Sequence, residues 1–193
     1  NVAVLISGNG SNLQALIDSF KEEKSLININ CVISNKKDAF GLKRAAKASI
    51  DNYFVDHTKF KSRKEFDLQL IQILEGYSPD LIVLAGFMRI LSQGFCHRWQ
   101  DKILNVHPSL LPKYAGGMDT NVHKEVLLNG DTETGCTIHF VTEDIDGGPI
   151  LIQKSCAVEE NDTVETLKKK VQALEGHAFV EAINLVNNKL YVR

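Results

Sequence analysis

The stretch "VAVLISGNGSNL", residues 2–13, places a strand, a tight turn and the start of a helix next to one another. Residues 2–6 are all apolar, which is typical of a strand buried on both faces. The glycines and asparagine at 8–10 favour a turn, and we expect a helix to begin near Asn12. This order predicts the opening strand and helix of a parallel α/β sheet.

The same alternation of strand and helix continues to residue 86. Apolar runs predict strands at 29–34, 52–55 and 80–86, and helical patterns fill residues 41–49 and 62–75 between them. Alternation of this kind is typical of a doubly wound, mostly parallel sheet. We therefore predict an α/β protein with a Rossmann-like sheet.

The second half of the chain has a different pattern. Two strand-like runs, 135–141 and 149–158, are separated by a glycine-containing turn, which predicts antiparallel additions to the sheet. Residues 163–186 then predict one long C-terminal helix with Thr163 as its N-cap, and 189–192 predict a short final strand. With no linker or repeat between the halves, we expect one domain over residues 1–193.

Composition excludes several classes of protein. The 193-residue chain is 44% hydrophobic, has a net charge of −2 and spreads its basic residues along its length, so we expect no nucleic-acid partner. No apolar run approaches the ~20 residues that cross a membrane, and residues 1–10 lack the features of a signal peptide. We expect a cytoplasmic protein with reduced thiols at its four cysteines, Cys31, Cys96, Cys136 and Cys156.

The glycine-rich turn resembles the dinucleotide fingerprint G-x-G-x-x-G, but Leu13 stands at its last position. The second strand is followed by Asn35 and Lys36 rather than by the acidic residue that holds an adenosine ribose, so we expect no NAD. Backbone N–H groups at a helix N-terminus, with Ser11 and Asn12, suit a single phosphate. A capped turn without a ligand remains the alternative.

Asn105 and His107 are polar residues within the apolar run "ILNVHPSLLP", residues 103–112. Residues two apart in a strand project to the same face, so these two side chains are expected to point together. Pro108 ends the strand, which places the pair at its carboxyl end, where open α/β sheets form their ligand crevice. An amide and an imidazole there are suited to stabilising a developing oxyanion.

A carboxylate is needed to set the protonation of His107. The best candidate is Asp146 in the loop "EDIDGG", and Glu143 and Asp144 in the same loop are alternatives. We expect this carboxylate to raise the His107 pKa and favour the imidazolium. His139, in a neighbouring strand, is a candidate supporting residue. The histidines show no metal-ligand spacing, and we predict no metal.

Several stretches together resemble the folate-dependent formyltransferases, and within them the glycinamide ribonucleotide branch. They are "LISGNGSNLQALID", "AGFMRILS", "LNVHPSLLPKYAG" and "GCTIHFVTEDIDGGPI", and the resemblance runs from residue 2 to about 190. It implies the Rossmann-like formyltransferase fold, with a phosphate- and ribonucleotide-binding half at 1–100 and a catalytic and folate-binding half at 101–193. It also implies 10-formyltetrahydrofolate as co-substrate and glycinamide ribonucleotide as acceptor, in a monomer or homodimer.

The resemblance assigns roles to individual positions. It implies a catalytic trio of Asn105, His107 and Asp146. Positions matching the ribonucleotide site are Gly10, Ser11, Asn12, Leu13, Gln14 and Glu175. Positions matching the folate site are Arg63, Met88, Arg89, Ile90, Leu91, Asn105, Thr142, Glu143, Asp144, Ile145 and Asp146. The chain departs from the family pattern at Gly176, which follows Glu175 where the family usually has histidine.

Other functions share parts of this pattern. A 10-formyltetrahydrofolate hydrolase shares the trio, but resembles this chain only after an additional N-terminal domain and lacks the "GNGSNL" turn. A methionyl-tRNA formyltransferase would need an RNA-binding domain and a basic surface. A nucleotide-binding module without activity explains the turn but not Asn105, His107 and Asp146. We therefore expect formyl transfer to glycinamide ribonucleotide by direct attack, with the hydrolase as the alternative.

Overall fold

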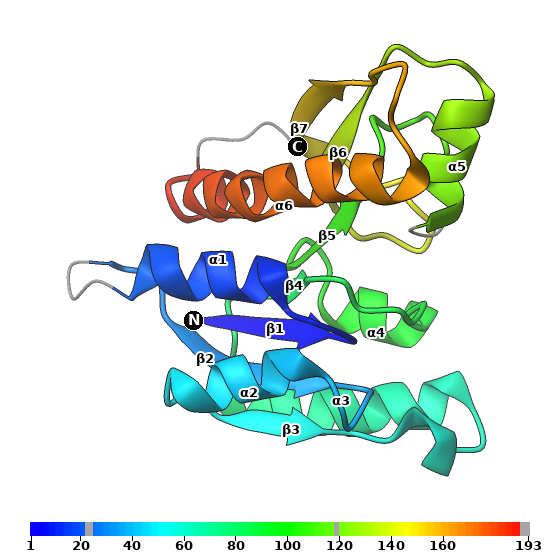
Figure 1. Ribbon diagram of the computed structural model, residues 1–193. Coiled ribbons are helices and arrows are strands. Elements are labelled where there is room, and N and C mark those ends of the chain that lie inside the picture. The colour runs from blue at the N-terminus through cyan, green and yellow to red at the C-terminus, as the bar shows by residue number, and fades with distance from the viewer. Residues whose placement is uncertain (22–24, 118–119, 190–193) are drawn as a thin grey trace. The chain divides into compact units, whose positions relative to one another are not determined.

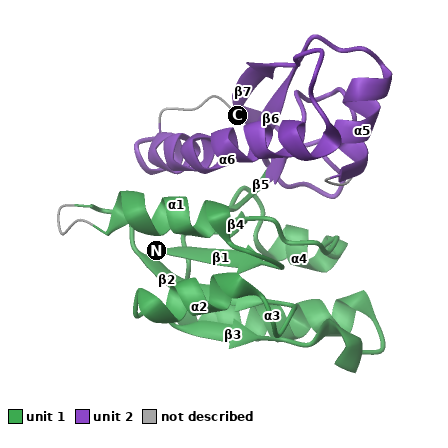
Figure 2. Ribbon diagram, viewed as in Figure 1, with its two compact units in different colours: residues 1–105 green, residues 106–193 purple. Residues whose placement is uncertain are grey.

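The computed structural model describes residues 1–21, 25–117 and 120–189. The chain forms two compact units, residues 1–105 and residues 106–193 (Figure 2). The boundary falls inside strand β5, Ile103–His107, directly after Asn105. Each unit is described by itself below.

Unit 1 is built on parallel strands in the order β3-β2-β1-β4-β5 (Figure 1). Besides β5 these are β1 (Val2–Ile6), β2 (Ile29–Ser34), β3 (Asn52–Phe54) and β4 (Leu81–Leu84). All five residues of β1 are buried, and Val4 pairs with Val32 on one side and Val83 on the other. A central strand covered on both faces has this continuous apolar composition, so the strand predicted from the opening stretch is confirmed.

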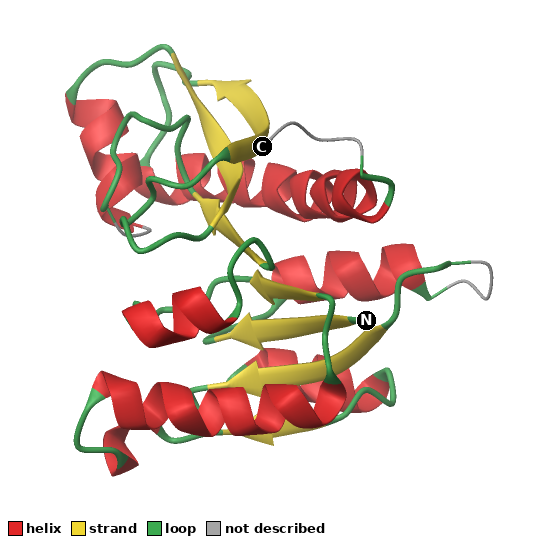
Figure 3. Cartoon of the chain, turned by 180° about the vertical axis from the view of Figure 1, so that it is seen from behind, coloured by secondary structure: helices red, strands yellow, loops and turns green. Residues whose placement is uncertain are grey.

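Helices cover both faces of this sheet. Helix α1 (Ser11–Phe20) packs beside α2 (Phe40–Lys47), and α3 (Arg63–Tyr77) packs beside α4 (Gln93–Arg98). Viewed from behind, α3 and α4 lie in front of the strands (Figure 3). A short 3-10 turn, His57–Lys59, precedes α3. The predicted doubly wound α/β arrangement is confirmed.

Unit 2 contains the antiparallel pair β6 (Glu133–Phe140) and β7 (Ile150–Ala157), as predicted. The long helix α6 (Val164–Asn187) packs against both strands (Figure 1). Thr163 caps it through a capping box in which Thr166 replaces the usual glutamate. Sequence patterns missed α5 (Thr120–Leu128), and most of the predicted strand at 189–192 lies outside the described residues.

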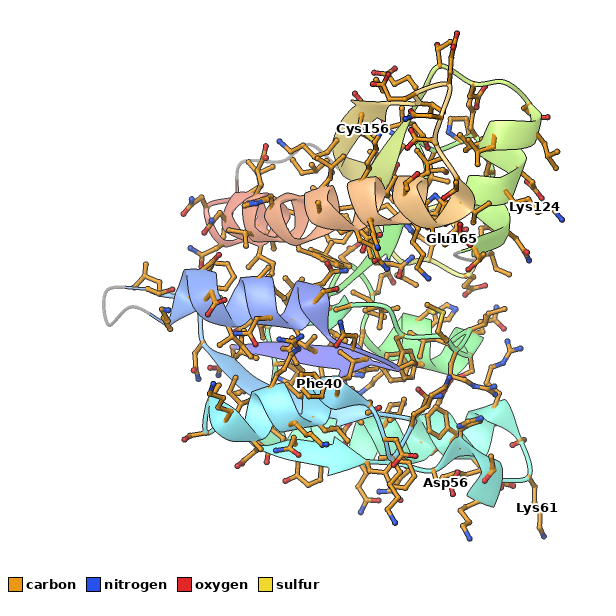
Figure 4. The ribbon with its side chains drawn as sticks, in the orientation of Figure 1. Phe40, Asp56, Lys61, Lys124, Cys156 and Glu165 are labelled. Carbon is orange, nitrogen blue, oxygen red and sulfur yellow. The ribbon has the colours of Figure 1, made fainter. Side chains whose placement is uncertain are left out.

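Two further features of the described part of the chain are the state of its cysteines and the lengths of its helices. All four cysteines lie in the described part of the chain and carry free thiols, three of them buried; Cys156 on β7 is partly exposed (Figure 4). Among residues 1–21, 25–117 and 120–189, no helix has the length and apolar character needed to cross a membrane.

Candidate active site

The side chains of His107 and Asp146 meet inside unit 2. Nδ1 of His107 lies 3.2 Å from Oδ2 of Asp146, and their side chains are only 4% and 10% exposed. His139 on β6 approaches the same carboxylate, with Nε2 3.6 Å from Oδ1. Glu143 and Asp144 are exposed to solvent. Of the three acids in this loop, the structure therefore pairs Asp146 with the histidine.

The loop after β5 holds this pair through backbone groups. The Tyr114 carbonyl lies 2.9 Å from Nε2 of His107, and the Gly116 N–H donates to Oδ2 of Asp146 at 2.8 Å. Both ring nitrogens of His107 thus face protein acceptors. Sequence reasoning missed Tyr114 and Gly116, because a backbone carbonyl or N–H carries no residue-type signal.

Burial decides the protonation of His107. Desolvation lowers the pKa of His107 below its usual 6.5, although the Asp146 charge and the Tyr114 carbonyl both raise it and His139 lowers it further. Asp146 raises the His107 pKa as expected, but burial outweighs it, so the expected net preference for the imidazolium is wrong for this structure. The physical reason is that a ring with 3% exposure loses more hydration on charging than the partner carboxylate returns.

Asp146 keeps its charge in the same surroundings. Burial opposes its ionisation, but His139, the Gly116 N–H and His107 together hold the Asp146 pKa below its usual 3.8. Its backbone has φ of +54°, a conformation that residues other than glycine rarely adopt. Such conformations persist only where the surroundings hold them, and they cluster at functional sites.

The lowered pKa values of His107 and Asp146 change the stability of the fold in the same direction as pH falls. A group whose pKa is lower in the folded than in the unfolded state contributes stability above its unfolded pKa and loses it as pH falls. We expect the free energy of unfolding to decrease as pH falls below about 6.5 because of His107, and again below about 3.8 because of Asp146. Urea midpoints at pH 7.5 and pH 5.5 measure the first decrease, which should be smaller in His107→Gln. An identical decrease in that variant would contradict this account.

Asn105 lies two residues before His107 in β5, and Val106 separates them. Alternation along the strand puts the amide and the ring on the same side of β5. The strand ends at His107, as the proline predicted. The amide and imidazole therefore stand at the carboxyl end of a strand, where the sequence placed them.

The glycine-rich turn in unit 1 leads directly into α1. Gly10 is the N-cap of α1 with φ of +72°, and no side chain caps the helix. The N-terminus of a helix favours an anion through the direction of its first N–H groups and through the helix dipole. A Cβ on Gly10 would lie 2.7 Å from Cα of Gly41, so only glycine fits between the two helix starts.

This geometry makes the two glycines of the turn unequal. We expect Gly10→Ala to destabilise the protein by about 1–3 kcal/mol, because the substitution combines a left-handed backbone with a backbone clash. The apparent KM for a phosphate-bearing substrate should rise as the turn shifts. Gly8→Ala is the matched control, since a Cβ there has nothing within 4 Å. Equal urea midpoints and kinetics for the two variants would contradict the prediction.

The other predicted ribonucleotide residues differ in what they offer. Leu13 is fully buried in the core, so it offers a ligand only its backbone. The Gln14 side chain binds Arg44 of α2 and Asp18. Glu175 lies on α6 in unit 2 and is 8% exposed, and the helix continues through Gly176. Of the predicted ribonucleotide residues, unit 1 therefore contains Gly10, Ser11, Asn12, Leu13 and Gln14, and unit 2 contains Glu175.

A cavity of about 560 Å³ lies beside the turn, at the carboxyl ends of β1, β2 and β3. Ser7 and Asn35 are buried in its lining, and Phe40 and Asp56 also line it (Figure 4). Gly10 and the α1 residues that follow it are not part of this lining. The lining does include Gly8 and Asn9, which directly precede the N-cap of α1.

Two side chains hold the predicted folate segment, residues 88–91, in unit 1. The Met88 N–H donates to Oγ of Ser7 at 2.8 Å, and the Ser92 N–H donates to Oδ2 of Asp67 at 2.5 Å. Asp67 is 2% exposed, and burial raises the pKa of its carboxyl. The segment between these two points has no regular secondary structure and exposes Met88 and Ile90.

The remaining folate residues are divided between the units. Arg63 is the exposed first residue of α3 in unit 1. Thr142, Glu143, Asp144 and Ile145 form an exposed loop after β6 in unit 2, ending at Asp146. A Cβ on Gly148 would lie 1.8 Å from the Phe140 carbonyl oxygen, so this glycine permits the loop to close on itself. Within the described ranges, no group of three or more histidine, cysteine or acidic residues is arranged to hold a metal ion.

Known proteins resemble this chain closely. The formyl transferase family matches residues 1–183. The trifunctional purine biosynthetic protein adenosine-3 of Bos taurus is 51% identical over 185 residues, which are 96% of this chain and 18% of that protein. Phosphoribosylglycinamide formyltransferase of Escherichia coli is 47% identical over 175 residues, which are 91% of this chain and 81% of that enzyme.

Solved structures share the fold. A glycinamide ribonucleotide transformylase from Symbiobacterium toebii aligns with a TM-score of 0.94 and 40% identity, covering 100% of this chain and 89% of that one. The chain spans only 18% of the length of the trifunctional relatives. These relatives therefore contain much more sequence than the part that matches.

Proposed function

The chain belongs to the formyl transferase family, and on this premise we propose that it transfers a formyl group from 10-formyltetrahydrofolate to the amine of glycinamide ribonucleotide. The contact between His107 and Asp146 carries the proposal, because it joins a proton donor to an ionised acid at a strand end. The names of the E. coli and S. toebii proteins support the choice of acceptor. The reaction belongs to purine synthesis in the cytoplasm.

The reaction begins when the substrate amine attacks the formyl carbon. A new N–C bond forms, and the carbonyl electron pair moves onto oxygen. Asn105 and protonated His107 donate hydrogen bonds to that oxyanion, so that its charge develops next to fixed donors. His107 exchanges the Tyr114 carbonyl for the formyl oxygen at Nε2. Before the reaction, burial disfavours the imidazolium form of His107. When the oxyanion forms next to the ring, its negative charge compensates the positive charge of the imidazolium.

Collapse of the tetrahedral intermediate breaks the bond between the formyl carbon and N10 of the folate. Asp146 holds His107 and, through an ordered water, helps to move a proton from the attacking amine to N10. Formylglycinamide ribonucleotide and tetrahydrofolate leave without a covalent enzyme intermediate. Holding the two substrates side by side supplies much of the acceleration by removing the entropy cost of their encounter.

Substrate binding uses two segments of unit 1, the start of α1 and residues 88–91. The uncapped start of α1, with Gly10, Ser11 and Asn12, takes the ribonucleotide phosphate. The backbone of residues 88–91 forms hydrogen bonds with the pterin ring, and Arg63 pairs with a folate carboxylate. In unit 2, Glu175 is the remaining predicted ribonucleotide residue, and the loop from Thr142 to Asp146 contains the remaining predicted folate residues.

A single assay separates this function from its alternatives. The purified protein receives a 10-formylfolate donor together with glycinamide ribonucleotide, with methionyl-tRNA, or with water alone. We expect release of the deformylated folate only with the ribonucleotide, and release that is slower by a factor on the order of 10²–10³ from His107→Ala prepared in the same way. Release in water alone would favour the hydrolase, and release with methionyl-tRNA would overturn the proposed acceptor.

A further inference from the structure

The loop between β5 and α5 contains a chain of contacts that ends on His107. The Tyr114 phenol donates to Oδ2 of Asp131 at 2.8 Å and accepts from the Asn129 amide at 2.9 Å. Lys113 reaches the other oxygen of the same carboxylate at 3.0 Å. The Tyr114 carbonyl, on the other end of the residue, accepts from His107. One tyrosine therefore joins an acid outside the active site to the candidate catalytic ring.

The backbone of Tyr114 needs such an anchor. Its φ is +60°, in the left-handed region, where side chains other than glycine are strained. A strained residue keeps its conformation only when neighbouring contacts hold it. Its carbonyl also accepts from the Gly117 N–H at 3.1 Å, and Oγ of Ser109 donates to the carbonyl of Lys113. The phenol contact with Asp131 is the side-chain part of this support.

The direction of the carbonyl determines where the proton sits on His107. A carbonyl oxygen only accepts hydrogen bonds, so a ring nitrogen facing it must carry hydrogen. The tautomer of a histidine is set in this way by the partner of the other nitrogen. Nδ1 faces Asp146, which also accepts and would attract the proton to that side. The two acceptors therefore compete for the single proton of the neutral ring.

We propose that Asp131 is a positioning residue for His107: through the Tyr114 phenol it holds the Tyr114 carbonyl against Nε2 and keeps a proton on that nitrogen. This is the nitrogen from which the proposed reaction needs a hydrogen bond, and the kinetic part of the inference rests on the proposed function. The charged and titratable groups facing His107 are Asp146 and His139. Those facing Asp131 are Lys113 and Tyr114, with Glu133 near Lys113.

The tautomer is measured directly on the folded protein without substrate. Long-range ¹H–¹⁵N spectra of protein labelled at histidine, recorded above the His107 pKa, report which ring nitrogen carries the proton; His107→Gln assigns the signal. We expect the proton on Nε2 in the original protein and a shift towards Nδ1 in Tyr114→Phe and Asp131→Ala. Asp131→Asn keeps an acceptor oxygen for the phenol and should retain more of the Nε2 tautomer than Asp131→Ala.

Lys113→Gln is the matched control. It removes the other partner of the Asp131 carboxylate but leaves the phenol contact in place, so the Nε2 tautomer should persist. An unchanged tautomer in folded Tyr114→Phe and Asp131→Ala would overturn the positioning role. If Asp131→Ala fails to fold, the comparison of Tyr114→Phe with Lys113→Gln decides the question.

Kinetics test the consequence for the reaction. We expect kcat to fall about tenfold in Tyr114→Phe while KM for either substrate stays unchanged, because the ring is misdirected but the binding segments are intact. A rise in KM without a fall in kcat would contradict the inference. Absence of formyl transfer in the original protein would instead contradict the proposed function, and the substrate-free spectra would still test the positioning role.

Discussion

His107→Ala is expected to lower turnover by a factor on the order of 10²–10³ while the protein still folds. In the proposed reaction the substitution removes the ring that donates to the developing oxyanion, and in the structure it removes the contact with Asp146. Loss of one such donor typically has an effect of this size, because the remaining donors and the bound substrates keep the rest of the acceleration. Initial rates with saturating substrates measure the effect, and circular dichroism checks the fold.

A matched control separates the loss of this ring from the loss of any histidine. His97 lies on α4 in unit 1 and is exposed, and no predicted site includes it. His97→Ala should keep normal turnover. Near-normal turnover in His107→Ala would show that the oxyanion role is wrong, since no other described ring pairs with Asp146 through a contact as short as 3.2 Å.

Asp146→Asn is expected to cost turnover at least as much as His107→Ala, on the order of 10³-fold. The amide has nearly the same shape but lacks the charge that raises the His107 pKa. The His107 pKa should therefore fall further, and the protonated ring should disappear at lower pH than in the original protein. The amide also cannot take a proton from the attacking amine.

Two measurements check this prediction. In the pH profile of turnover, the acid limb that reflects ionisation of the Asp146 carboxylate should disappear. The alkaline limb, where His107 loses its proton, should shift to lower pH. An NMR titration of the His107 ring should show the lower pKa without substrate. An unchanged profile would assign the base to another residue. Glu160→Gln, which removes an exposed acid of unit 2 outside the predicted sites, should leave both measurements unchanged.

The fold was predictable where a pattern is local. The apolar residues 2–6 identified a buried central strand, and the alternation up to residue 86 identified the doubly wound sheet. Thr163 was found as a cap because its hydrogen bond is made to residues three positions away. Helix α5 was missed: with nine residues it is short, and a short helix carries a weak periodic signal.

The candidate site was predictable in its parts but not in its assembly. Period-two spacing in β5 put Asn105 and His107 on one side of a strand, and the strand ended where Pro108 required. The choice among Glu143, Asp144 and Asp146 stayed open from composition alone. The family resemblance pointed to Asp146, and the structure shows that contact directly.

By itself, the sequence determined the α/β class, the glycine-rich turn after β1, and the polar pair at the end of β5. These features follow from steric limits and spacing that act over a few residues. Tertiary structure alone decided that Tyr114 and Gly116 hold the two ends of the His107–Asp146 pair, and that burial lowers the His107 pKa. Every residue has a backbone carbonyl, so the residue type does not indicate which carbonyl contacts His107. The desolvation of the ring depends on all the atoms that surround it, so local sequence does not predict its effect on the pKa.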